Sequence, residues 1–114
     1  MSKAAVLMLV LSLTGCYYDD APVREIPVIE EDVSFATEIQ PIFNDNNCMQ
    51  CHPSAANLDL REGSAYASLV PDFAIPNDSD GSRLYAKLVD GHRSVSVDEI
   101  ALIKAWIDQG AQEN

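Results

Sequence analysis

Two cysteines and a histidine lie within five consecutive residues near the middle of the chain. Cys51 follows Cys48 by three positions, and His52 follows Cys51 directly. In a helical turn, residues i, i+3 and i+4 share one face, so this spacing places two thiols and an imidazole on one surface. Thiols form covalent bonds or bind metals as thiolates, and neutral imidazole is a common metal ligand. The trio therefore predicts a site that bonds a cofactor or a metal, or that forms a disulfide.

Three kinds of site use the Cys-x-x-Cys spacing. A thioredoxin-like disulfide expects a preceding strand within a βαβ unit, which the helical pattern of this chain does not offer. A structural zinc ion needs a fourth ligand, and His92 is the only other histidine. When histidine follows directly, C-x-x-C-H is the attachment signature of haem c, in which both thiols form thioethers with haem vinyl groups and the imidazole binds iron. The sequence therefore predicts one covalent haem c, held by Cys48 and Cys51, with His52 as an iron ligand.

Four helical segments are expected to position this site. The first begins after Ser34, carries apolar residues at helical spacing and should start a new turn or kink near Gln40 because of Pro41. A short helix follows a cap at residues 63–64, and another, after a loop at 71–81, includes residues 84–88. These segments, with no alternating strands, predict an all-α domain over residues 34–114, of about 80 residues, which is small for one core.

The last of these segments has the clearest local signals. Ser96 and Glu99 form a capping box, after which Ile100, Ile103, Trp106 and Ile107 line one helical face. Gly110 is the expected end of the helix.

Segments outside the pentapeptide resemble small bacterial cytochrome c domains. They are Ile-Gln-Pro-Ile-Phe at 39–43, Ser-Arg-Leu-Tyr at 82–85 and Trp-Ile-Asp-Gln-Gly-Ala at 106–111. The resemblance covers nearly all of residues 35–111 and implies an all-helical fold around one haem, with terminal helices that cross near the haem edge and contain Phe43 and Trp106. It also implies electron transfer. Tyr66, Tyr85 and Trp106 are interpreted as ordinary packing residues.

The second axial position departs from that family, whose members usually place a methionine before the C-terminal helix. Residues 90–96 contain none, and Met49 lies inside the attachment loop, from which it cannot comfortably reach the opposite haem face. Three alternatives stay open: His92 as the distal ligand, a five-coordinate iron, or another side chain. His92 also fits an ordinary solvated loop histidine beside Arg93.

The N-terminus has the pattern of a bacterial lipoprotein signal. Lys3 precedes an apolar run at 4–13, and Leu-Thr-Gly-Cys at 13–16 resembles a lipobox. We expect residues 1–15 to be removed, Cys16 to be acylated, and residues 16–33 to form an acidic tether. Tyr17 after Cys16 favours the outer membrane, facing the periplasm or the cell surface. The alternative is an ordinary secretory signal with Cys16 as a stray thiol.

The charge of the chain restricts its partners. Loss of Lys3 with the signal would leave six basic and 18 acidic residues, a formal charge of −12. Nucleic acid and anionic lipid are poor partners for such a surface, so we expect redox proteins with basic docking surfaces. Electron transfer is the expected function, rather than enzymatic catalysis. The alternatives are a haem-based ligand sensor or weak peroxidase with an open iron site, and a subunit in which haem is mainly structural.

Overall fold

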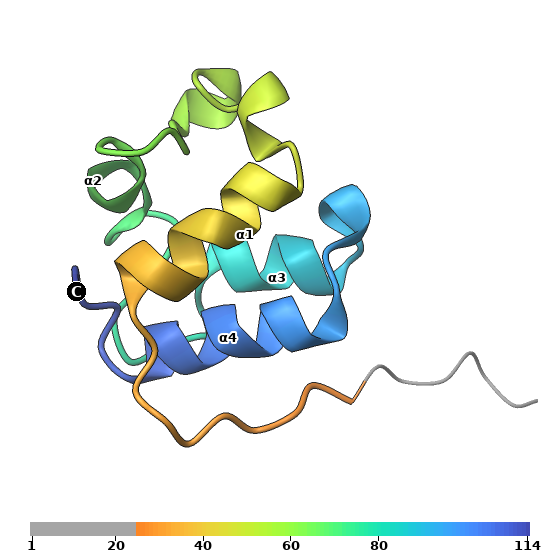
Figure 1. Cartoon of the computed structure of the whole chain (residues 1–114), viewed down its shortest axis with the longest axis vertical. Coiled ribbons are helices and arrows are strands. Elements are labelled where there is room, and N and C mark those ends of the chain that lie inside the picture. The colour runs from red at the N-terminus through yellow and green to blue at the C-terminus, as the bar shows by residue number, and fades with distance from the viewer. Residues whose placement is uncertain (1–24) are drawn as a thin grey trace, which may run out of the picture.

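The computed structural model describes residues 25–114, and this part of the chain is mostly helical, with no strand (Figure 1). The expected all-α class is confirmed. The α-helices are α1 (Gln40–Asp45), α2 (Ala65–Leu69), α3 (Arg83–Val89) and α4 (Val97–Asp108). Single helical turns stand between or before them: η1 (Phe35–Ile39), η2 (Cys48–Gln50), η3 (Ala55–Asn57) and η4 (His92–Ser94).

The first helical segment starts where the sequence predicts, and a new helix begins at Gln40, next to Pro41, as one of the two alternatives expected. The Ser34 hydroxyl accepts a hydrogen bond from the Thr37 amide at 3.3 Å, which caps η1. η1 is a π-helical turn that gives way to α1 at Gln40, directly before Pro41. Because proline lacks an amide hydrogen, it is tolerated at the first turn of a new helix but not inside a continuous one.

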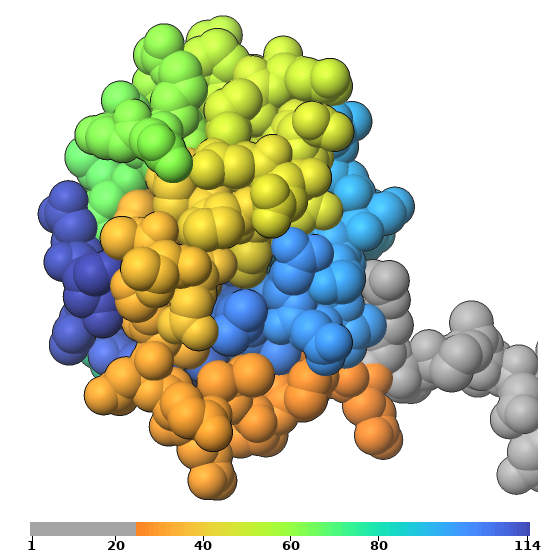
Figure 2. Space-filling model, viewed as in Figure 1, coloured from red at the N-terminus to blue at the C-terminus, as the bar shows by residue number. Residues whose placement is uncertain are grey.

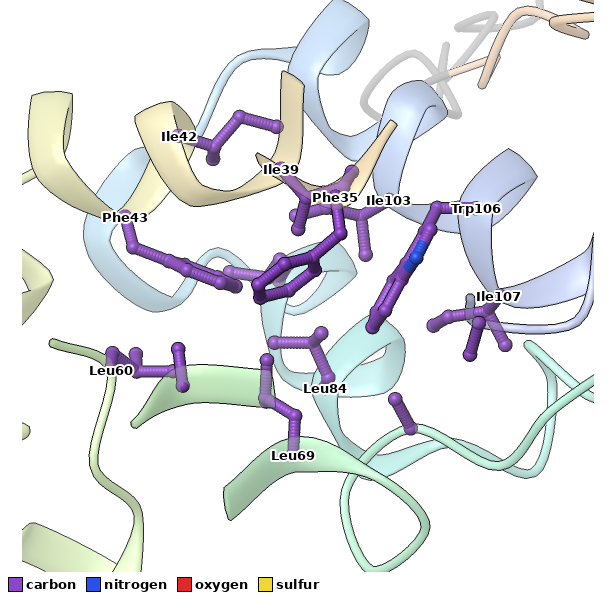
Figure 3. Close-up of a cluster of buried hydrophobic side chains, with 14 of the residues drawn as sticks. Phe35, Ile39, Ile42, Phe43, Leu60, Leu69, Leu84, Ile103, Trp106 and Ile107 are labelled. Carbon is purple, nitrogen blue, oxygen red and sulfur yellow. The ribbon is translucent and has the colours of Figure 1, made fainter. Parts of the chain in front are cut away.

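The core forms where η1 crosses the antiparallel pair α3 and α4 (Figures 1 and 3). Trp106 is 1% exposed, and its ring lies 5.2 Å from that of Phe35 and 6.4 Å from that of Tyr66, measured between centroids. The Tyr66 hydroxyl donates to the Ala111 carbonyl at 2.8 Å, and Tyr85 packs against the edge of the core. The interpretation of Tyr66, Tyr85 and Trp106 as packing residues is confirmed.

Both ends of α4 are closed by local hydrogen bonds. The Ser96 hydroxyl accepts from the Glu99 amide at 3.2 Å, while the Glu99 carboxylate accepts from the Ser96 amide at 3.3 Å. At the other end, Gly110 has a φ of +110°, its amide donates to Ile107, and the Ala111 amide donates to Trp106. This Schellman arrangement needs a residue that accepts positive φ, so the predicted capping box and terminator are both confirmed.

Replacing Ser96 by alanine is expected to lower the free energy of unfolding by about 1 kcal/mol, because the Glu99 amide loses its acceptor. Urea unfolding of the purified protein measures the change. Ser64 supplies a matched control: it is the N-cap residue of α2, as expected, but its side chain makes no capping hydrogen bond. Ser64→Ala should therefore leave the midpoint nearly unchanged, and equal losses for the two variants would contradict the capping role of Ser96.

The chain before Ser34 is extended but lies against the domain (Figure 2). Val33 is 3% exposed and its amide donates to the Gln109 side chain at 2.8 Å, while the Gln109 amide group donates to the Glu31 carbonyl. Ile26 and Ile29 pack against the same core. The part of the predicted tether that the structure describes is thus held along α4 rather than standing apart from it. The predicted signal peptide and Cys16 lie outside the described residues.

No helix within residues 25–114 has both the length and the apolar character needed to cross a membrane.

Candidate functional site

A cavity of about 380 Å³ opens beside the Cys48–His52 segment, and the residues singled out in the sequence meet on its walls. Cys48, Cys51, His52 and His92 all line it. Its volume falls within the roughly 300–1,000 Å³ typical of small-molecule and cofactor sites. The remaining apolar wall comes from the segment after the motif, the loop before α3, and α3 itself: Ala55, Ala56, Leu58, Leu60, Phe73, Leu84 and Leu88.

The attachment loop is a compact helical turn. The Cys51 and His52 amides both donate to the Cys48 carbonyl, at 3.3 and 3.0 Å, so the predicted helical turn is confirmed. Asn47, with a φ of +55°, turns the chain into this loop from α1. The Leu60 amide then donates to the His52 carbonyl at 3.1 Å, and the Gln40 side chain donates to the Leu60 carbonyl at 2.9 Å. These bonds tie the loop to α1 and to the cavity wall.

The two cysteines are free thiols in different environments. Cys48 is 9% exposed, whereas Cys51 is open to solvent. Burial raises the pKa of the Cys48 thiol, and the nearby positive charge of Arg93 only partly opposes this effect. The Cys48 sulfur therefore carries its hydrogen at neutral pH.

His52 is oriented by its own loop. Its Nδ1 lies 2.9 Å from the Ala55 carbonyl oxygen. A carbonyl oxygen can only accept, so Nδ1 carries the hydrogen and the Nε2 of a neutral ring keeps its lone pair. Histidines that bind metals are commonly fixed in this way by a backbone carbonyl at the other ring nitrogen. His52 is thus prepared to bind a metal through Nε2.

His92 approaches the same cavity from the end of α3. It begins the η4 turn, and the centroid of its exposed ring lies 6.3 Å from that of His52, with 59° between the ring planes. Met49 packs against the hydrophobic core and does not line the cavity. This placement agrees with the expectation that Met49 does not reach the far side.

The cavity wall also carries positive charge, which the sequence reasoning missed. Arg83, Lys87 and Arg93 line the cavity, and no aspartate or glutamate of the described residues does. The other two basic residues of the described chain are paired with aspartates, Arg61 with Asp59 and Lys104 with Asp108. In a chain with a net charge of −11, this grouping favours an anionic ligand. The available signal was the four-residue spacing of Arg83 and Lys87, which places both on one helical face.

Phe73 connects the cationic and apolar parts of the wall. The Arg83 guanidinium carbon lies 4.6 Å from the centroid of the Phe73 ring. A cation at this distance over an aromatic face is attracted to it, which holds Arg83 at the rim while the ring contributes apolar surface.

The donors within residues 25–114 include no group of three or more His, Cys, Asp or Glu side chains arranged to hold a metal ion. A haem iron takes at most two protein ligands, so this finding does not bear on haem. The cavity combines thiol and imidazole groups, apolar walls and three cationic side chains. This combination fits an amphipathic, anionic macrocycle. Comparisons with protein-family models, curated proteins and solved structures return no match, so the arrangement of the chain's own residues is the basis for assigning its function.

Proposed function

We propose that the chain is a monohaem c-type cytochrome domain that transfers electrons. The observation that carries the proposal is the single cavity in which Cys48, Cys51 and His52 share an apolar wall with three cationic side chains. Cys48 and Cys51 would hold the haem through thioethers, and His52 would bind its iron through Nε2. Arg83 and Lys87 would pair with the two propionates. The all-helical fold agrees with the resemblance to small cytochrome c domains.

For thioether formation, the protein needs only to hold the two thiols beside the haem vinyl groups. Each of the two thiols would add across one vinyl group, with its sulfur bonded to the inner carbon and its hydrogen transferred to the outer carbon. Such an addition needs no oxidant. Haem held by these residues would supply an iron that gains and loses one electron. The apolar walls would shield part of the macrocycle from water.

The direct test is to export the full chain in a bacterium that assembles c-type cytochromes. One haem per chain should remain attached after denaturation and acid extraction, and the purified protein should show a reversible one-electron redox wave. A chain that gains no covalent haem, while a second exported c-type cytochrome in the same cells does, would refute the proposal.

The acidic surface should direct the choice of redox partner. Electron exchange with a cationic redox protein is expected to slow several-fold as ionic strength rises, because salt screens charges over about 10 Å at 0.1 M. Stopped-flow spectroscopy over a salt series measures the rate. An uncharged small-molecule oxidant supplies the control and should react at a rate independent of salt. Salt-independent exchange with the cationic protein would exclude electrostatic docking.

The proposed location is the outer membrane, through acylation of Cys16. The support is the segment Leu-Thr-Gly-Cys at 13–16 after an apolar run. Cys16→Ala is expected to abolish incorporation of labelled fatty acid and to shift the protein from the membrane to the soluble fraction, because stable anchoring requires the acyl chains. Fractionation with unchanged membrane recovery would contradict lipid anchoring.

A further inference from the structure

We infer that His92 is the second axial ligand, so that His52 and His92 bind one iron from opposite sides. This inference rests on the proposed haem attachment and goes further by assigning the distal face. The ring centroids of the two histidines are 6.3 Å apart. Two imidazoles that bind one metal at about 2.0–2.1 Å have their donor atoms about 4 Å apart and their ring centres about 6 Å apart. The observed spacing therefore matches a single metal between the rings.

The lining of the cavity offers few other side chains that could bind iron. Within residues 25–114, the lining apart from the three attachment residues and His92 contains only alkyl or aromatic side chains and the cations Arg83, Lys87 and Arg93. A protonated guanidinium or ammonium group donates hydrogen bonds and has no lone pair for iron. Met49, which has a suitable sulfur, packs against the core instead. His92 is thus the remaining side chain of the described cavity wall that can bind iron from the distal side.

Arg93 holds the histidine in this position. Its Nη2 donates to the Asn47 carbonyl at 3.1 Å and to the Gln50 side-chain oxygen at 3.0 Å, which ties the η4 turn to the attachment loop. Arg93 itself has a φ of +62°, a left-handed conformation that non-glycine residues rarely adopt. The bonds across 43 and 46 positions of sequence therefore fix a turn that would otherwise relax. Arg93 is a positioning residue for His92.

Ligation by two histidines has a functional consequence. Iron with both axial positions filled is closed to small external ligands, and replacing methionine by histidine lowers the reduction potential relative to a His/Met site. The site then favours electron carriage at a lower potential over ligand sensing or peroxidase activity.

The test compares the exported, haem-loaded wild type with His92→Ala and His92→Met. Wild-type ferrous protein should be spectrally unchanged by carbon monoxide, and its ferric form should be low-spin. His92→Ala should bind carbon monoxide stoichiometrically and become high-spin, and added imidazole should restore the low-spin spectrum. His92→Met should stay low-spin with a higher potential. Wild type that binds carbon monoxide stoichiometrically, or a His92→Ala spectrum identical to wild type, overturns the inference.

Haem content, measured first, separates this failure from failure of the proposed function. Covalent haem with an unchanged His92→Ala spectrum overturns only the distal assignment, whereas absence of haem overturns both. Gln50→Ala tests the positioning role without altering the cavity lining: because Arg93 loses one of its two hydrogen bonds to the attachment loop, the ferrous variant should bind carbon monoxide in part, where wild type does not. Gln50→Glu keeps the acceptor and should behave as wild type. A Gln50→Ala spectrum as unchanged by carbon monoxide as that of wild type overturns the role of Arg93.

Discussion

Replacing Cys48 and Cys51 together by alanine is expected to remove all haem that survives denaturation of the chain. Two thioethers are the only covalent links proposed, and the His52–iron bond does not persist when the fold is lost. Haem staining after denaturing electrophoresis, with the intact mass of the protein, measures the loss. The variant should also be less stable, because an empty apolar cavity in so small a domain forfeits the contacts that the macrocycle supplies.

The two single cysteine substitutions test each thioether separately. Cys48→Ala and Cys51→Ala should each keep one thioether, with the reduced absorption band at longer wavelength because one vinyl group remains conjugated. Met49→Leu is the matched control, since Met49 lies in the same loop but outside the cavity lining, and it should keep both links. Covalent haem in the double variant would show that other residues make the attachment.

Trp106→Ala is expected to have the largest effect on stability, about 3–5 kcal/mol, because it removes a fully buried aromatic side chain and leaves a cavity. Small domains have total free energies of unfolding of about 5–15 kcal/mol, so this loss is a large share of the total. The lost contacts include the rings of Phe35 and Tyr66 and the hydrogen bond from Trp106 Nε1 to the Gln112 carbonyl at 2.9 Å. Chemical unfolding of the haem-loaded protein measures the change.

Tyr66→Phe is the control for Trp106→Ala. It keeps the aromatic packing and removes the hydrogen bond to the Ala111 carbonyl, so it should cost only about 1 kcal/mol. If Trp106→Ala unfolds at the same midpoint as Tyr66→Phe, the packing of η1 against α4 is not the main contribution to stability.

The features that could be predicted from sequence are those with short-range causes. The capping box of Ser96 and Glu99, the stop at Gly110 and the break before Pro41 each depend on residues within one or two helical turns. The shared face of Cys48, Cys51 and His52 has the same local origin. Apolar spacing was also enough to predict the all-α class, since helical periodicity is a property of each segment alone.

Two local signals did not decide the tertiary contacts made by their residues. Ser64 is the N-cap residue of α2, as the sequence predicts, but its side chain makes no capping hydrogen bond. Acidic residues and prolines before Ser34 predict an extended tether, and in residues 25–33 the extended chain also packs Ile26, Ile29 and Val33 against the domain. In both places a local preference of at most a few kcal/mol competes with hydrogen bonds or apolar burial that depend on the final arrangement of the chain.

The sequence by itself thus determined that Cys48, Cys51 and His52 share one helical turn, because this arrangement needs no distant partner. Only the tertiary structure decided what surrounds them. It brings His92 across 40 positions to within 6.3 Å of His52, measured between ring centroids, and it gathers Arg83, Lys87 and Arg93 around one apolar cavity. These relations depend on how α3 and the η4 turn pack against the attachment loop, and side-chain spacing along the chain carries no information about such long-range contacts.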